Sequence, residues 1–226
     1  MIVINPNLED GDYHCHSSNF SDGLNSIDEM VKMAGEIGLK ELAITDHSLA
    51  TQEAFGFSRV NWRGLVRRWR NIHNDVKVIF GVEADLLNEK GDICDKIEQD
   101  KKEDFVILSA HGGVYGGKGD PEKITEAYLH AIRRHHKQID FIGHPCIYYF
   151  KAHLDLEPVI EAANYYKIPL EFNCTNFING KTIRSNLDLM LEKADRIYVN
   201  SDAHMLGELR NNRKVGLDYL RKKGII

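Results

Sequence analysis

The stretch Arg196-Ile197-Tyr198-Val199-Asn200-Ser201-Asp202-Ala203-His204 decides the fold when it is set beside Gly11-Asp12-Tyr13-His14-Cys15-His16 near the start of the chain. Each stretch is a short strand ending in two metal-capable side chains two residues apart, so both side chains of a pair point to the same side. Closure of a barrel makes the first and last strands neighbours, and the four side chains would then converge. In an open sheet they could lie on opposite edges. The two stretches therefore favour a barrel.

The chain between them repeats one strand and one helix. Helical patterns such as the capping box Ser26-Ile27-Asp28-Glu29 alternate with short apolar strands, which implies a parallel sheet covered by helices. No GxGxxG follows the first strand, so a dinucleotide-binding sheet has little support. Polar residues end the strands at intervals of 33, 36, 28, 33, 29 and 29 residues, one β/α unit each time: His14/His16, Asp46/His47, Glu83, His111, His144, Asn173 and Asp202/His204. We predict that they meet at the carboxyl face of a barrel, where active sites are built.

Length and composition exclude several classes of protein. A chain of 226 residues suits one domain, predicted to span 1–226. The formal net charge of -5 argues against a broad electrostatic nucleic-acid binder. No apolar run approaches a membrane span, and no signal peptide is visible. The four cysteines form no CxxC pair, so we expect reduced thiols and a cytoplasmic protein.

The polar residues at the strand ends suggest metal chemistry. The donors are imidazole and carboxylate with no thiolate, which argues against a closed structural zinc site and suits zinc, manganese or iron in an open geometry. They are too many for one ion and fit two or three ions that share a bridging carboxylate. Such ions activate a shared water and clamp an in-line displacement at phosphorus. Phosphoester hydrolysis is therefore the predicted use.

These motifs resemble those of the PHP domain (polymerase and histidinol phosphatase), in order from about residue 12 to 205. They are His14-Cys15-His16-Ser17, Ser21-Asp22-Gly23, Ile44-Thr45-Asp46-His47-Ser48, Gly81-Val82-Glu83-Ala84-Asp85, Ser109-Ala110-His111, Gly143-His144-Pro145 and Asn200-Ser201-Asp202-Ala203-His204. The resemblance implies a distorted (β/α)7 barrel and a stand-alone, metal-dependent phosphatase that acts on a small phosphorylated substrate, a phosphomonoester, in the manner of the histidinol phosphatases.

The resemblance also implies three divalent ions of zinc, manganese or iron. His14, His16, Glu83 and Asp202 would hold the first, and Glu83 would bridge to a second held by His111 and His144. Asp22, His47 and His204 would hold the third. A hydroxide shared by the first two ions would attack phosphorus in line, which gives Glu83 and Asp202 the catalytic roles.

Other residues near the strand ends have less specific signals. Asp46 precedes His47 and is interpreted as orienting a ligand imidazole rather than binding metal. Candidate substrate-binding residues are Asn173, which ends a strand, and the loop cations Lys118, Lys181 and Arg184. Gly112–Gly119 is interpreted as a mobile lid, because it lacks the spacing of a P-loop.

Three alternative functions remain. The first is a nuclease or nucleotide phosphatase of the same chemistry, for which an arginine face of Arg59, Arg63, Arg67 and Arg70 could steer nucleic acid. The second is an amidohydrolase, which usually needs a bridging lysine where this chain has His111. The third is a metal-dependent binding module, which the intact ligand set disfavours. The sequence leaves the oligomeric state open.

Overall fold

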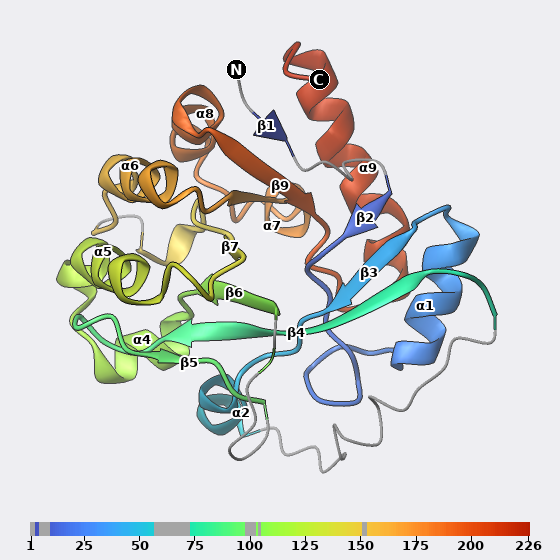
Figure 1. The fold of residues 1–226 in the computed structure, drawn as a ribbon, viewed down its shortest axis with the longest axis horizontal. Helices are drawn as coiled ribbons and strands as arrows, with labels where there is room; N and C mark the ends of the chain where they lie inside the picture. The colour runs from blue at the N-terminus through green and yellow to red at the C-terminus, as the bar shows by residue number, and fades with distance from the viewer. Residues whose placement is uncertain (1–2, 5–9, 57–72, 98–102, 104, 151–152) are drawn as a thin grey trace.

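The chain folds around one parallel sheet that curls towards closure. A computed structural model describes residues 3–4, 10–56, 73–97, 103, 105–150 and 153–226 (Figure 1). The strands are β1 (Val3–Ile4), β2 (Gly11–Asp12), β3 (Glu41–Ile44), β4 (Lys77–Leu86), β5 (Ile93–Cys94), β6 (Phe105–Ser109), β7 (Phe141–Ile142), β8 (Leu170–Asn173) and β9 (Arg196–Asn200). Strands β3, β4 and β6 to β9 occur where the sequence has its short apolar runs, as expected for strands buried on both faces.

The order of the strands confirms the predicted barrel. The sheet runs β1-β9-β8-β7-β6-β4-β3-β2, and every pairing along this path is parallel. Strand β5 pairs antiparallel with β4. Just beyond the ends of β2 and β9, Cys15 bridges Ala203, and the His16 amide donates to the Ala203 carbonyl at 2.9 Å. The first and last barrel strands therefore meet.

Helices cover the outside of the sheet, and their ends follow the predicted signals. Ser26 and Glu29 form the expected capping box at the start of α1, and Gly38 with φ of 85° follows its end. The helices are α1 (Ile27–Glu36), α2 (Leu49–Phe55), α4 (Gly112–Lys118), α5 (Ile124–His135), α6 (Leu156–Tyr166), α7 (Cys174–Ile178), α8 (Arg184–Lys193) and α9 (Leu206–Lys222), with short 3-10 helices η1 (Pro121–Lys123) and η2 (Tyr148–Phe150). None of the described helices is long and apolar enough to cross a membrane.

The core is a set of contiguous apolar clusters inside and around the barrel. The largest joins helices α5, α6, α8 and α9 to strands β6 to β9, and a second lies under α1. Tyr13, Phe105, Phe141 and Tyr198 contact one another and fill the barrel near the starts of its strands. This packing closes the amino end of the barrel and leaves the carboxyl end for polar residues.

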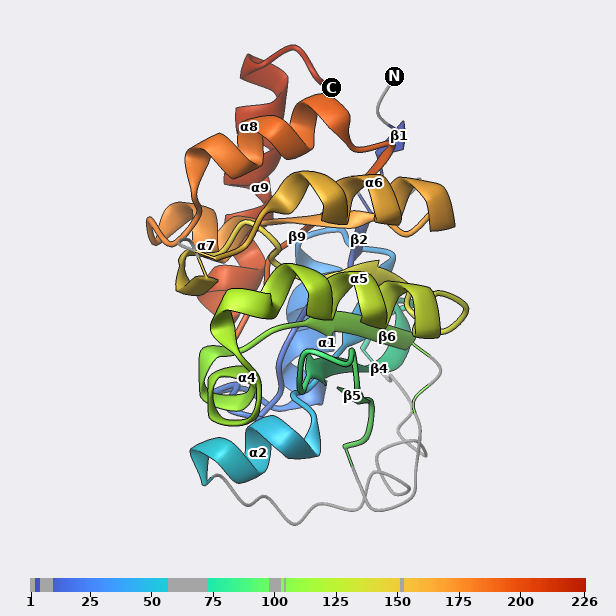
Figure 2. The same ribbon diagram turned by 90° about the vertical axis from the view of Figure 1, so that its left-hand side faces the viewer.

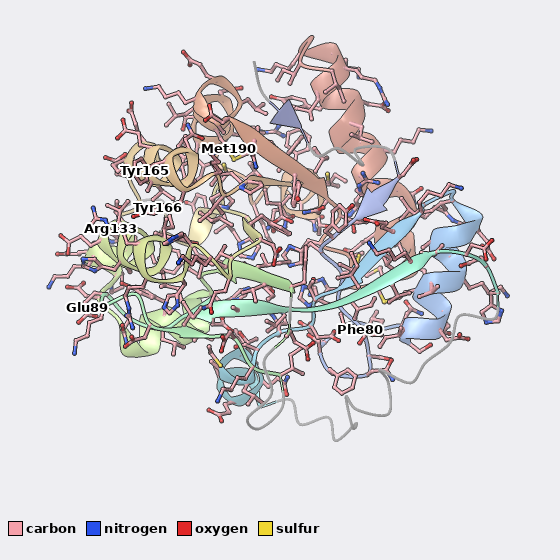
Figure 3. All side chains as sticks on the ribbon, viewed as in Figure 1. Phe80, Glu89, Arg133, Tyr165, Tyr166 and Met190 are labelled. Carbon is pink, nitrogen blue, oxygen red and sulfur yellow. The ribbon has the colours of Figure 1, made fainter. Side chains whose placement is uncertain are left out.

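The view in Figure 2 shows α4 and α7, which follow the carboxyl ends of β6 and β8, on the same side of the molecule. Figure 3 shows Arg133 of α5 and Tyr165 of α6 on the outer surface of the helical layer; both side chains are exposed. The carboxyl ends of the strands and the outer helical surface are thus separate faces.

One sequence interpretation is wrong and one cannot be placed. Residues Gly112–Lys118, interpreted as part of a mobile lid, form the helix α4 despite their four glycines. Its Tyr115 is fully buried and contacts Phe150 edge to face, so tertiary packing outweighs the low helix propensity of glycine. The arginine face of Arg59, Arg63, Arg67 and Arg70 lies outside the described residues.

Candidate metal centre

Nine imidazole and carboxylate side chains gather at the carboxyl end of the barrel. His14 and His16 follow β2, Glu83 lies in β4, and the others follow β3, β6, β7 and β9 or lie in the loop after β2. We call this set the histidine–carboxylate cluster: His14, His16, Asp22, His47, Glu83, His111, His144, Asp202 and His204. These are the residues that the sequence nominates as ligands, and the structure brings all of them together.

Glu83 lies at the centre of the histidine–carboxylate cluster and is 1% exposed. Its Oε1 lies 2.8 Å from Nε2 of His144, 3.3 Å from Nε2 of His111 and 3.4 Å from Nε2 of His14. Its Oε2 lies 2.8 Å from Nδ1 of His47 and 3.5 Å from Nε2 of His16. One carboxylate thus contacts five imidazoles, as a bridging ligand would.

The other two carboxylates extend the cluster towards solvent. Asp202 Oδ1 lies 3.2 Å from Nε2 of His16 and 3.5 Å from Nε2 of His14, which joins the first and last strands. Asp22 Oδ1 lies 3.3 Å from Nε2 of His204 and 3.5 Å from Nε2 of His47. The side chains of Asp22 and His204 are 42% and 30% exposed, so they form the mouth of the centre.

Two groups of the cluster, Glu83 and His16, are already in the protonation states that bind divalent metals. Burial opposes ionisation of Glu83, but the neighbouring His111, His14 and His47 outweigh it and hold the pKa of its carboxyl well below the ordinary range. Burial and the nearby rings of His204 and His47 lower the pKa of His16 to about 3. Ionised carboxylates and neutral imidazoles are the forms that bind divalent metals.

Three imidazoles of the cluster behave in the opposite way. Burial lowers the pKa of His14 and of His111, but neighbouring carboxylates outweigh it and raise both well above the ordinary value. The third is His204 at the mouth. Burial lowers the pKa of His204, but its hydrogen bond with Asp22 and the charge of Asp202 raise it overall to about 9. In the protein without metal this imidazole is therefore protonated at neutral pH. Metal binding there must displace a proton, so affinity at this part of the centre falls as the pH falls.

Unsatisfied buried atoms show that the donors fit metal ions. Among the described residues, His14 Nε2, His16 Nε2 and Glu83 Oε2 are buried and make no hydrogen bond. Buried polar atoms normally have partners, and an ion would satisfy all three. Three groups have donor atoms within 4.8 Å of one another: His16, Asp22, His47 and His204; His14, His16 and Glu83; and His47, Glu83 and His111. These groups resemble the expected ligand sets with three differences. His16 joins the mouth group, Asp202 is absent from the group of His14 and His16, and His47 takes the place of His144 beside His111.

Two carboxylates that sequence reasoning missed hold two of the candidate ligand histidines. Glu171 of β8 is buried, and its Oε1 lies 2.8 Å from Nδ1 of His14. Asp85 of β4 lies 2.6 Å from Nδ1 of His111 and accepts hydrogen bonds from Ser48 and Thr51. Each carboxylate fixes one ring nitrogen and turns the other towards Glu83, the arrangement typical of metal-binding histidines.

The remaining sequence candidates lie around the cluster. Asp46 accepts hydrogen bonds from the backbone and side chain of Ser17, the residue after His16. Asn173 is buried, caps α7 and donates to Asp202 at 2.9 Å and to Glu171 at 3.1 Å. Both arrangements hold the polypeptide that carries ligand residues.

The three candidate cations have different surroundings. Lys118 is the last residue of α4. The guanidinium of Arg184 lies 3.7 Å from the centre of the Phe177 ring, on which it stacks. Lys181 is exposed and lines a cavity beside the strand ends. Lys181 is therefore the candidate best placed to meet a substrate.

Two candidate ligand positions have unusual backbone conformations. His144 has φ of 28° and Asp202 has φ of 54°, whereas left-handed backbone is uncommon for residues other than glycine. The His144 amide donates to Glu171 Oε2 at 2.7 Å, and the Asn173 amide group holds Asp202. These bonds stabilise conformations that cost about 1–3 kcal/mol each, as is frequent at functional sites.

We expect Glu171→Gln to lower both bound metal and kcat/KM by about 10–100-fold, the usual effect of losing a partner of a metal-binding histidine. Both Glu171 oxygens accept hydrogen bonds, from His14 and Asn200 on one side and from His144 and Asn173 on the other. A glutamine must point its NH2 group at one of these donor pairs. An NH2 group cannot accept hydrogen bonds, so the two donors of that pair would lose their acceptor. Metal analysis and steady-state kinetics measure the effect, with the exposed Glu161→Gln as the control. Equal metal content and activity in the two variants would contradict it.

The comparisons with known proteins agree with this geometry. A family model described as "PHP domain" matches residues 12–171. A probable phosphatase of Caldanaerobacter subterraneus subsp. tengcongensis is 29% identical over 86% of this chain and 76% of its own length. A probable phosphatase of Caldicellulosiruptor bescii is 30% identical over 91% of this chain and 85% of its own.

A solved structure shares the fold. Histidinol phosphate phosphatase from Lactococcus lactis subsp. lactis, complexed with zinc, L-histidinol and phosphate, superposes with a TM-score of 0.58. The alignment covers 99% of this chain and 95% of that one, at 19% sequence identity. The nearly closed barrel is therefore a known architecture.

Proposed function

The chain belongs to the PHP domain family, and from this membership we propose that it is a metal-dependent phosphatase that hydrolyses a phosphomonoester at the histidine–carboxylate cluster. The observation that carries the proposal is Glu83, one buried carboxylate in contact with five imidazoles at the carboxyl end of a barrel. Such a set of nitrogen and oxygen donors with an exposed mouth suits catalytic rather than structural metal sites.

The division of labour within the cluster is part of the proposal. His14, His16 and Glu83 are almost fully buried and have nitrogen or oxygen atoms without hydrogen bonds, so they would hold divalent ions. His47, His111, His144 and Asp202 would complete these sites, and Asp22 and His204 would hold a third ion at the mouth. Bound ions would supply an activated water and neutralise the charge on the phosphate oxygens.

Three residues next to the cluster would hold its metal-binding side chains in place for the reaction. Glu171 and Asp85 fix the rings of His14 and His111, and Asn173 fixes Asp202, so the donors need little rearrangement when a substrate binds. The exposed mouth at Asp22 and His204 is the side from which phosphate would enter. Zinc, manganese and iron all suit these donors. The proposed substrate is a small phosphorylated molecule, and histidinol phosphate is the first to test because the solved relative carries L-histidinol and phosphate.

We also propose that the protein works in the cytoplasm as a single domain over residues 1–226. All four cysteines, Cys15, Cys94, Cys146 and Cys174, are free thiols. Burial raises the pKa of the Cys146 thiol far above its ordinary value, so this thiol stays protonated and unreactive. Reduced, buried thiols are usual in a reducing compartment.

The proposal is tested with purified protein loaded with manganese or zinc. We expect release of inorganic phosphate from p-nitrophenyl phosphate and from L-histidinol phosphate, and no hydrolysis of amide substrates. With oxygen-18 water, label should appear in the phosphate, because the bond broken is the one between phosphorus and the ester oxygen. A protein that binds metal fully but hydrolyses no phosphomonoester would refute the proposed function.

A further inference from the structure

A cavity lies beside the histidine–carboxylate cluster, and none of the residues that line it belongs to the cluster. It has a volume of about 230 Å³ and is lined by Ile147, Tyr148, Tyr149, Gly180 and Lys181. Its walls come from the segment after β7 and the segment after α7. We call it the tyrosine–lysine cavity. Complete pockets for drug-sized ligands are larger, so this volume suits one part of a ligand.

The walls of the tyrosine–lysine cavity are joined by backbone contacts. The Tyr148 amide donates to the Lys181 carbonyl at 2.9 Å, and Ile147 forms an antiparallel bridge with Thr182. The Ile183 amide donates to the Cys146 carbonyl at 2.9 Å. This short ladder holds the two segments together without any ligand, so the cavity is formed in advance.

The cavity adjoins the ligand residues of two strands. The Ile147 amide donates to the carbonyl of His144 at 3.0 Å, which places one wall a single turn from a ligand. The Tyr149 ring lies on the other side, where its Cγ would be 3.9 Å from a Cβ on Gly112, the residue after His111. A phosphate at the histidine–carboxylate cluster would therefore have its ester group beside this cavity.

The surface of the cavity is aromatic. Tyr148 and Tyr149 are 58% and 60% exposed, more than the intermediate exposure that is usual for tyrosine. Exposed large rings beside a polar site mark a binding surface more often than a folding element. Flat, rigid rings lose little conformational entropy on binding and stack well on planar groups.

The charge of the cavity is positive. Among the described residues, Lys181 is the only charged one that lines the cavity, and no described carboxylate lies within ion-pair distance of its ammonium group. A cation beside an apolar surface favours a negative group over an ammonium group. L-histidinol phosphate, whose leaving group carries an ammonium group, should therefore be a poorer substrate than an anionic ester. The cavity therefore has the complementarity of a planar, apolar group with a negative substituent.

Resting on the proposed function, we propose that the tyrosine–lysine cavity binds the leaving group of the substrate. The substrate class is a phosphomonoester whose alcohol part is planar and apolar and carries an anionic substituent. The phosphate would occupy the metal centre, the planar part would pack against Tyr149, and the anionic substituent would pair with Lys181. Lys181 and Tyr149 are thus specificity-determining residues and take no part in the hydrolysis step.

The test compares kcat/KM of the metal-loaded enzyme for 4-carboxyphenyl phosphate and 4-(aminomethyl)phenyl phosphate. The quantity compared is kcat/KM for the carboxyl ester divided by kcat/KM for the aminomethyl ester. Dividing this ratio in Lys181→Glu by the same ratio in the wild type removes the intrinsic reactivities of the two substrates. We expect Lys181→Glu to lower this ratio by about tenfold or more. The substitution turns the ion pair with the carboxylate substrate into a repulsion, and it turns the repulsion of the aminomethyl substrate into an ion pair. We expect Tyr149→Ala to raise KM for phenyl phosphate by about tenfold, with a smaller change in kcat.

Tyr165→Ala is the matched control, because Tyr165 is 79% exposed on the outer surface of α6 (Figure 3). It should leave every constant unchanged. If Lys181→Glu leaves the ratio unchanged, or Tyr149→Ala behaves like Tyr165→Ala while the wild type hydrolyses these esters, the inference is wrong and the phosphatase function stands. If the metal-loaded wild type hydrolyses none of the esters, the proposed function itself fails and the inference fails with it.

Discussion

Replacing Glu83 by glutamine is expected to lower kcat/KM for phosphomonoesters by about 1000-fold or more and to remove at least one bound metal ion. Glu83 contacts five imidazoles through two oxygens, and its Oε2 makes no hydrogen bond among the described residues. Glutamine keeps the shape but replaces one acceptor oxygen with an NH2 group, which cannot bind a cation. It also removes the negative charge that offsets the positive charge of the surrounding imidazoles and of bound metal ions. Metal analysis and steady-state kinetics on the same preparation measure the two effects.

The control for Glu83→Gln is Glu192→Gln, an exposed glutamate on α8. This variant should bind metal and hydrolyse substrate like the wild type. Circular dichroism should show the same secondary structure in both variants, because the barrel core lies apart from the cluster. A Glu83→Gln protein with full activity and full metal content would refute the central role of this carboxylate.

Removal of metal is expected to have the second largest effect, a loss of more than about 100-fold in activity that manganese or zinc restores. Dialysis against a chelator should also lower the melting temperature. An ion present at 100 times its dissociation constant adds about 2.7 kcal/mol to stability, and for a domain of this size that corresponds to about 5–10 °C. The physical reason is that His14, His16 and Glu83 present buried atoms without hydrogen bonds when no ion is bound.

The measurement pairs differential scanning calorimetry with an activity assay during back-titration of each ion. The Glu83→Gln variant should show a smaller rise in melting temperature on titration than the wild type, which links the thermal effect to this centre. Activity that persists in protein shown by elemental analysis to be metal-free would refute the metal-dependent mechanism. Different ions that restore stability equally but activity unequally would identify the catalytically competent metal.

Much of the fold is predictable from the sequence because its signals are local. Strands buried on both faces are continuous apolar runs, and the capping box at Ser26 and the glycine at position 38 mark the ends of a helix. Helix α4 is not predictable in this way. Its segment is rich in glycine, and it is helical because Tyr115 packs against residues far away in the sequence. The two-residue strand β1 carries no periodic signal.

The candidate site is predictable from the sequence where its residues lie at the ends of predicted strands. Regular spacing identified the residues of the histidine–carboxylate cluster because a parallel barrel collects the carboxyl ends of its strands. Glu171 was missed because its partner His14 lies 157 residues away and nothing local distinguishes a buried glutamate from an exposed one. Asp85 could have been found, since it lies two residues after Glu83 on the same strand and so points to the same side.

The seam between β2 and β9 has a consequence for how the barrel opens. Backbone pairing there is sparse: one bridge, Cys15 to Ala203, and two amide–carbonyl bonds around it. The proposed ligands His14, His16 and Asp202 lie at this seam, so bound ions would act as a cross-link between the two ends of the chain. The free energy of local opening, which governs amide hydrogen exchange, would then be set at the seam by metal concentration and elsewhere by packing. Metal availability would thereby control both the chemistry and the lifetime of the closed barrel.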